Sequence, residues 1–131
     1  MNKAILPGST IGIIGGGQLG QMMALSAKEM GYKVIILDPT ANCPAAQVSD
    51  DQIVANYDDL EKLIALAKRC DVLTYEFENV DAETIAEVKK YTQVPQGTKA
   101  LSITQNRILE KNFIEENDFR TVPHVVIKKY F

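Results

Sequence analysis

The chain has few of the residues from which metal sites and disulfides are built. It contains one histidine, two cysteines and no tryptophan. Cys43 and Cys70 form no C-x-x-C pair and His124 is the only imidazole, so the usual cysteine and histidine ligands of a zinc site are missing. We therefore expect no structural metal, and we expect two reduced cysteines, as is usual in a cytoplasmic protein.

Long apolar runs and concentrated positive charge are missing as well. No run approaches the ~20 apolar residues that span a bilayer, and the N-terminus carries too short an apolar stretch for a signal peptide. The net charge is −3, and the lysines are scattered instead of forming a stripe that could follow a phosphodiester backbone. We therefore expect a cytoplasmic protein whose partners include neither a membrane nor nucleic acid.

β-branched apolar runs alternate with amphipathic segments along the 131 residues, of which 46% are hydrophobic. Four of these runs predict buried strands, at 10–14, 33–38, 53–54 and 71–77. Such alternation predicts an α/β fold, a Rossmann-like open parallel sheet with helices on both faces. Ligands bind such sheets at the carboxyl ends of the strands.

Helical periodicity predicts helices in the segments between these strands. The first helix follows residue 17 and closes at Gly31, and its methionines are expected to fill the core. Asn56 and Asp81 are expected to cap two further helices. Residues 93–96 and 122–131 are predicted as strands, and residues 100–117 as a helix with a kink near Thr104.

The run TIGIIGGGQLGQMM, residues 10–23, places a glycine turn between a strand and a helix. Gly15, Gly17 and Gly20 have the G-x-G-x-x-G spacing, which permits a tight turn, close approach of an anion and close packing of helix on strand. One interpretation is a nicotinamide dinucleotide site, because Asp38 lies close to the ~20-residue offset of the ribose-binding acid. The other is that the glycines only let helix and strand touch.

The run YEFENV places Glu76 and Glu78 at alternate positions, where a strand would point both carboxylates to one side. Two carboxylates are costly to bury but suit a cleft that offers hydroxyls, amines or backbone N–H groups. The alternative is a pair of solvated acids at a strand end. The predicted sheet places them on the same edge as the glycine turn.

The run QNRILEK places Arg107 and Lys111 on one helical face. Such pairs usually form a solvated basic face. Alternatively, the planar guanidinium of Arg107 could bind a nucleotide phosphate through two hydrogen bonds. The spacing alone leaves both interpretations open.

Together, GIIGGGQLGQMM, YEFENV, and PQG followed by QNRILEK resemble the amino-terminal part of the N5-carboxyaminoimidazole ribonucleotide synthetases. These ATP-grasp ligases are the ATPase subunit of phosphoribosylaminoimidazole carboxylase in purine biosynthesis. The resemblance implies that ATP, with Mg²⁺, phosphorylates bicarbonate, and that the 5-amino group of aminoimidazole ribonucleotide is then carboxylated. It also implies a homodimer for the full-length enzyme.

The same resemblance implies a division of the chain into a Rossmann-like pre-ATP-grasp domain, residues 1–103, and a truncated remainder. Residues 104–131 would be a linking helix and the start of the ATP-grasp domain. No catalytic or metal-binding residue is expected anywhere in the 131 residues, and Arg107 is expected to approach ATP, although Asn106 stands where the family often has aspartate. The residues expected to bind the ribonucleotide are Gly15, Gly16, Gly17, Gln18, Leu19, Gly20, Tyr75, Glu76, Glu78 and Asn79.

Two other classes of function remain open at this stage. The chain could be the NAD-binding Rossmann domain of an oxidoreductase, or a nucleotide-sensing module without chemistry of its own. Within the ATP-grasp enzymes, a glycinamide ribonucleotide transformylase or a biotin carboxylase could share such an opening domain. Gln18, Leu19 and the YEFEN run favour the aminoimidazole enzyme.

The isolated polypeptide is expected to have no ATPase activity, because the family's ATP-binding lysines, magnesium-binding carboxylates and glycine-rich lid lie beyond residue 131. Phosphate release should be measured with ATP, Mg²⁺ and bicarbonate, with and without aminoimidazole ribonucleotide. A full-length synthetase of the same family serves as the positive control. Ribonucleotide-dependent hydrolysis by the 131-residue chain would contradict the expectation.

Overall fold

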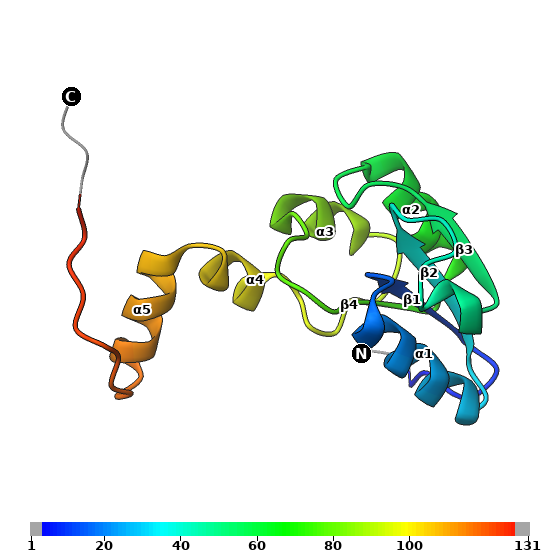
Figure 1. Ribbon diagram of the computed structural model, residues 1–131, viewed down its shortest axis with the longest axis horizontal. Helices are drawn as coiled ribbons and strands as arrows, with labels where there is room; N and C mark the ends of the chain where they lie inside the picture. The colour runs from blue at the N-terminus through cyan, green and yellow to red at the C-terminus, as the bar shows by residue number, and fades with distance from the viewer. Residues whose placement is uncertain (1–3, 128–131) are drawn as a thin grey trace.

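A four-stranded parallel sheet forms the centre of the computed structural model, which describes residues 4–127 (Figure 1). The strand order is β3-β2-β1-β4. The register aligns Ile14 with Leu37 on one side and with Tyr75 on the other, so these strands end at one common edge. The strands are β1 (Thr10–Ile14), β2 (Lys33–Asp38), β3 (Asp51–Val54) and β4 (Val72–Tyr75).

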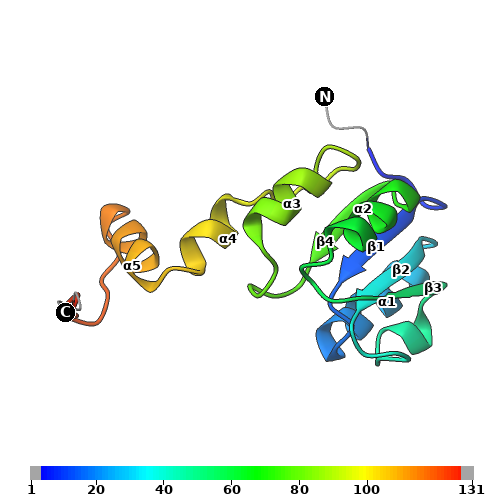
Figure 2. The same cartoon turned by 90° about the horizontal axis from the view of Figure 1, so that it is seen from above.

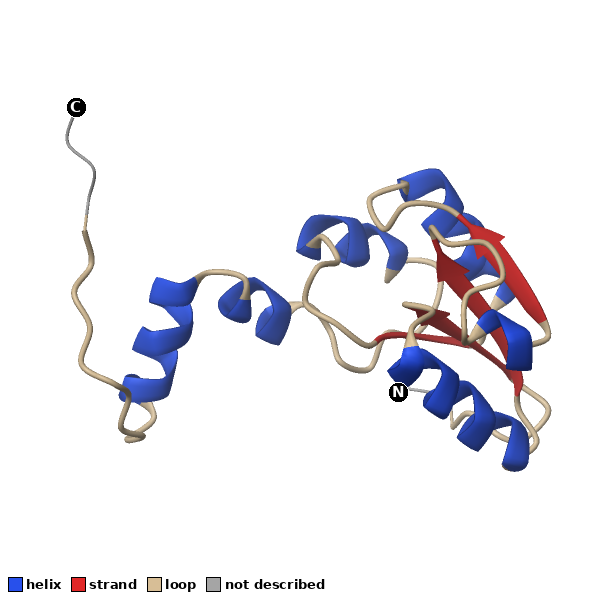
Figure 3. Ribbon diagram, viewed as in Figure 1, coloured by secondary structure: helices blue, strands red, loops and turns tan. Residues whose placement is uncertain are grey.

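Helices cover both faces of this sheet, which confirms the predicted fold class (Figures 2 and 3). Alternate strand residues supply two separate cores, since Ile13 and Ile36 pack on the face of α1 while Ile14 and Leu37 pack on the face of α2 and α3. The helices are α1 (Gln18–Glu29), the short 3-10 helix η1 (Ala46–Val48), α2 (Leu60–Arg69), α3 (Ala82–Val88), α4 (Lys99–Thr104) and α5 (Arg107–Glu116).

Of the three methionines in and just after α1, only Met23 packs against the core as predicted. Met22 and Met30 are 56% and 59% exposed, whereas Gly20, Ala24 and Ala27 are buried. Helix α1 therefore approaches the sheet with its small side chains, which allows close packing and leaves the longer ones at the rim.

The carboxyl-terminal part extends away from the sheet, with α4 and α5 in sequence (Figure 1). The predicted single helix is interrupted because the Asn106 side chain accepts hydrogen bonds from the Ile108 and Leu109 amides, at 3.0 and 3.2 Å, and so begins a new helix. Residues 122–127 form no strand, contrary to the prediction, and residues 128–131 lie outside the described range.

Three local predictions were also wrong. Asp59, not Asn56, caps α2 by accepting a hydrogen bond from the Lys62 amide. Strand β4 ends at Tyr75, so the acidic residues that follow it are not in the strand. The predicted strand at 93–96 is reduced to one bridge between Val72 and Gln93.

The assignment of the core predicts that removing a large side chain from the sheet lowers the stability much more than removing one from α1. Leu73→Ala should lower the free energy of unfolding by about 2–5 kcal/mol, because Leu73 is fully buried and its removal leaves a cavity. Met22→Ala should change it by less than about 1 kcal/mol, because that side chain is exposed. Urea titrations followed by circular dichroism measure both. Equal losses would contradict this assignment of the core.

Candidate functional site

The glycine turn, residues 15–17, joins β1 to α1 at the edge where the strands end. Gly15 has a φ of +110°, and a Cβ there would lie 2.8 Å from Cγ of Glu76 and 2.8 Å from Cε1 of Phe77. A Cβ on Gly20 would overlap the carbonyl oxygen of Gly15. At Gly17, apart from neighbours along the chain, no atom of the described residues lies within 4 Å of a Cβ position. Gly15 and Gly20 are therefore needed for packing, and the turn is open to an approaching group at Gly17.

The first turn of α1 presents backbone N–H groups at this opening. Gly17 is the N-cap, and within the described structure no side chain caps the helix. The amino end of a helix carries a partial positive charge, and its first amides lack partners within the helix. The backbone amides of Gln18 and Leu19, the first two helical residues, therefore have the arrangement that the glycine spacing predicted for binding an anion.

Asp38, at the end of β2, holds the glycine turn from inside the protein. Its Oδ2 accepts hydrogen bonds from the Gly16 amide at 2.7 Å and from the Tyr57 hydroxyl at 2.6 Å, and its Oδ1 accepts one from the Thr40 amide at 2.8 Å. The side chain is only 6% exposed. Burial raises the pKa of Asp38, but the hydrogen bonds from Tyr57, Thr40 and Gly16 outweigh it, and the pKa lies below its usual value.

This arrangement removes the basis of the dinucleotide interpretation. A ribose-binding acid must turn an oxygen toward the ligand. Both oxygens of Asp38 accept hydrogen bonds from the protein instead. The sequence spacing between the glycines and Asp38 therefore places this carboxylate where it supports the glycine turn.

Gly16 is confined more closely than the spacing rule suggests. A Cβ at this position would overlap Sγ of Cys43 and would lie 2.8 Å from Cβ of Asp38. The Gly16 carbonyl accepts a hydrogen bond from the Ala45 amide at 2.9 Å. The triple glycine run is the sequence signal for this position, whereas nothing in the sequence indicates that Cys43 and Tyr57 lie beside the turn.

The acidic segment, residues 75–79, follows β4 and lies against the glycine turn. The Glu76 amide donates to the Ile14 carbonyl at 3.3 Å, and the Tyr75 hydroxyl donates to the Gly97 carbonyl at 2.9 Å. Oε2 of Glu76 is buried and has no hydrogen-bond partner among the described residues. A buried carboxylate oxygen without a donor is costly, so this atom marks a place where a ligand or water donor is favoured.

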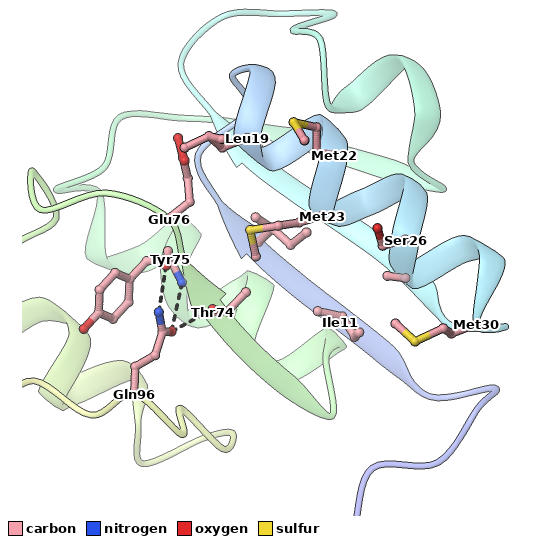
Figure 4. A pocket seen from close by; sticks show the side chains of 12 residues that line it. Ile11, Leu19, Met22, Met23, Ser26, Met30, Thr74, Tyr75, Glu76 and Gln96 are labelled. Atoms are coloured by element: carbon pink, nitrogen blue, oxygen red, sulfur yellow. Dashed lines mark hydrogen bonds between the residues drawn. The ribbon is translucent and has the colours of Figure 1, made fainter.

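A hollow of about 710 Å³ lies between α1 and β4 and contains part of the predicted site. In Figure 4 the Glu76 carboxylate lies at the end of this hollow where Leu19 lies, and Met22, Met23 and Met30 lie along its α1 side. The lining residues are Ile11, Ile13, Leu19, Met22, Met23, Ser26, Ala27, Met30, Thr74, Tyr75, Glu76 and Gln96.

Glu78, Asn79 and Arg107, which were also predicted to lie in the site, do not line this hollow. Glu78 lines a second hollow of about 280 Å³, which shares Tyr75 and Glu76 with the first. Asn79 lines a different one, beside Tyr57. Arg107 begins α5, where its side chain is 74% exposed and forms an ion pair with Glu110.

Within residues 4–127 no group of three or more histidine, cysteine, aspartate or glutamate side chains is placed to hold a metal ion. No described helix is both long enough and apolar enough to cross a membrane.

An open parallel sheet covered by helices on both faces, with a glycine turn leading into an uncapped helix, defines a Rossmann-like α/β domain. The chain belongs to the family of ribonucleotide synthetase pre-ATP-grasp domains, whose model matches residues 8–105.

Individual relatives agree with this family assignment. The N5-carboxyaminoimidazole ribonucleotide synthase of Bacillus subtilis is 48% identical over 129 residues, covering 98% of this chain and 34% of that protein. The Staphylococcus aureus N5-carboxyaminoimidazole synthetase, crystallised with ADP, has a TM-score of 0.92 at 44% identity, covering 96% of this chain and 34% of that one. The Aspergillus clavatus synthase, in complex with ADP and 5-aminoimidazole ribonucleotide, has a TM-score of 0.79 at 32% identity, covering 86% and 30%. This chain thus spans about a third of the length of its curated relatives.

The hydrogen bonds of Asp38 predict a pH-dependent contribution to stability. Asp38→Asn should lower the free energy of unfolding at pH 7 by about 1.5–3 kcal/mol, because an amide cannot accept from donors on both of its sides. The folded pKa is lowered, so the carboxylate stabilises the fold above its unfolded pKa of about 3.9, and this contribution is lost as pH falls through the folded pKa.

Urea midpoints of wild type and variant, measured from pH 7 down to pH 3, test this expectation. The difference between the two proteins should narrow as the pH falls below 4. Asp58→Asn provides a control, since Asp58 is exposed and its carboxylate accepts no hydrogen bond from the described residues. A difference that is constant with pH would show that the ionised carboxylate is not what supports the turn.

Proposed function

We propose that the chain is the ribonucleotide-binding, amino-terminal part of an ATP-dependent carbon–nitrogen ligase. The ligase carboxylates 5-aminoimidazole ribonucleotide with bicarbonate, giving N5-carboxyaminoimidazole ribonucleotide for purine biosynthesis. The observation that carries the proposal is the buried, unpartnered Oε2 of Glu76 beside the uncapped amino end of α1. The names of the relatives and the Aspergillus clavatus complex with the ribonucleotide support it.

The two walls of the site suit opposite ends of a ribonucleotide monophosphate. Its phosphate would accept hydrogen bonds from the amides that follow Gly16, where the helix end is positive. Its ribose hydroxyls or exocyclic amine would donate to Glu76, which repels a phosphate but accepts from such groups. Tyr75, Glu78 and Asn79 complete the proposed wall, with Glu78 in the adjoining hollow.

The remaining parts of the reaction belong to the whole ligase. We assign ATP, Mg²⁺ and bicarbonate to it as substrates and metal, with Arg107 approaching ATP from α5. The division into residues 1–103 and 104–131, a homodimeric enzyme and a cytoplasmic location are part of the same proposal. The relatives crystallised with ADP support the nucleotide.

Binding of 5-aminoimidazole ribonucleotide to the ¹⁵N-labelled chain tests the ligand. The ribonucleotide and ribose 5-phosphate should shift the amide resonances of Gly17, Gln18 and Leu19, because the phosphate would contact them. NAD should leave these resonances unchanged, because Asp38 is buried and both of its oxygens already accept hydrogen bonds from the protein instead of facing a ribose. Shifts with NAD, or none with millimolar ribonucleotide, would contradict the proposal.

Glu76→Gln tests the acidic wall of the same site. It should weaken ribonucleotide binding about tenfold, since a hydrogen bond to a charged acceptor is replaced by one to a neutral acceptor. Ribose 5-phosphate, which lacks the base, measures how much of this loss belongs to the ribose. Glu83→Gln, a change of the same type on the exposed surface of α3, should have no effect.

A further inference from the structure

Tyr57 lies between β3 and α2 and lines neither of the two hollows of the candidate site, yet it contacts the turn's support. Its hydroxyl donates to Oδ2 of Asp38 at 2.6 Å, and the same oxygen accepts from the Gly16 amide at 2.7 Å. The side chain is partly buried. The Tyr57 hydroxyl is therefore connected to the glycine turn through one residue, Asp38.

The ring of the same tyrosine contacts the acidic segment. The rings of Tyr57 and Phe77 pack edge to face, with centroids 4.7 Å apart and planes at 67°. Phe77 follows Glu76 directly, and its ring lies against Gly15, where a Cβ would be 2.8 Å from Cε1. Asn79 and Tyr57 also line one hollow. The side chain thus contacts the support of the turn through its hydroxyl and the acidic segment through its ring.

We infer that Tyr57 is a positioning residue, which sets the distance between the glycine turn and the acidic segment although it contacts no ligand itself. The inference rests on the proposed function, since that distance matters for binding only if both walls hold one molecule. No other described side chain hydrogen-bonds to Asp38 and also stacks on Phe77.

The hydroxyl remains a donor at every pH at which the protein would work. Burial raises the pKa of Tyr57, and the hydrogen bond to Asp38 and the charges of Asp38, Cys43 and Glu76 raise it further. Asp38 in turn stays ionised, because the pKa of its carboxyl is lowered. The Tyr57 hydroxyl therefore keeps its proton and donates to an ionised Asp38 carboxylate.

Tyr57→Phe keeps the ring and removes only the hydroxyl. We expect it to weaken 5-aminoimidazole ribonucleotide binding about fivefold, with the loss shared between the phosphate and the remainder of the ligand. Without ligand, the amide resonances of both Gly16 and Glu76 should shift, although the two lie on different strands' ends. Tyr32→Phe is the matched control, because the Tyr32 hydroxyl donates to the Ile5 carbonyl at 3.1 Å, away from the site. It should change neither the binding nor these two resonances.

Each outcome of this experiment bears on one of the two proposals. Wild-type affinity in Tyr57→Phe, or a shift of Gly16 alone, overturns the positioning role and leaves Tyr57 as a local support of Asp38. If the wild-type chain binds no ribonucleotide, the proposed function fails, and the joint shift of the two amides then decides whether Tyr57 couples the segments. Phe77→Leu adds a second test, because it removes the ring contact of Tyr57 while Tyr57→Phe removes the hydroxyl contact. The effects of the two changes on binding should not add if both act by displacing the same Tyr57 side chain.

Discussion

The hydrogen bond from the Gly16 amide to the buried Asp38 carboxylate is the interaction on which the candidate site depends. A buried carboxylate is tolerable only when donors replace its water, and here Gly16, Thr40 and Tyr57 do so. The bond directs the inner amide of the turn toward the protein. The amides that follow it, at the amino end of α1, have no side-chain cap among the described residues.

The close approach of α1 to the sheet has a second consequence for the site. Small residues face the sheet, so the long apolar side chains of α1 lie at its rim and line the hollow toward β4. The hollow is therefore largely apolar, with Glu76 at one end. A buried acceptor in such surroundings favours a ligand that brings its own donor, because the nearby side chains supply none.

Most of the fold could be predicted because its signals are local. Strands β1 and β2 are continuous apolar runs, and the glycine spacing indicates the turn, its open side and its close packing. Two examples show why other features could not be predicted. Asn56 and Asp59 are both good caps, so composition could not choose between them. The roles of Gly16 and Tyr57 depend on Cys43, Asp38 and Phe77, which are distant in the sequence and meet only in the fold.

The same glycine fingerprint and the same acid serve two different kinds of ligand, and the direction of the carboxylate separates them. In a dinucleotide site the acid faces outward and accepts from a ribose. Here the donors of Gly16, Thr40 and Tyr57 surround Asp38, and the acid that faces a hollow is Glu76, on the neighbouring strand's end. The free acceptor thus follows β4 instead of β2, and these strands lie on opposite sides of β1 and its glycine turn. The proposed ribonucleotide needs one anion site and one acceptor for its hydroxyls or amine, and the uncapped end of α1 and Glu76 are the two groups that could supply them.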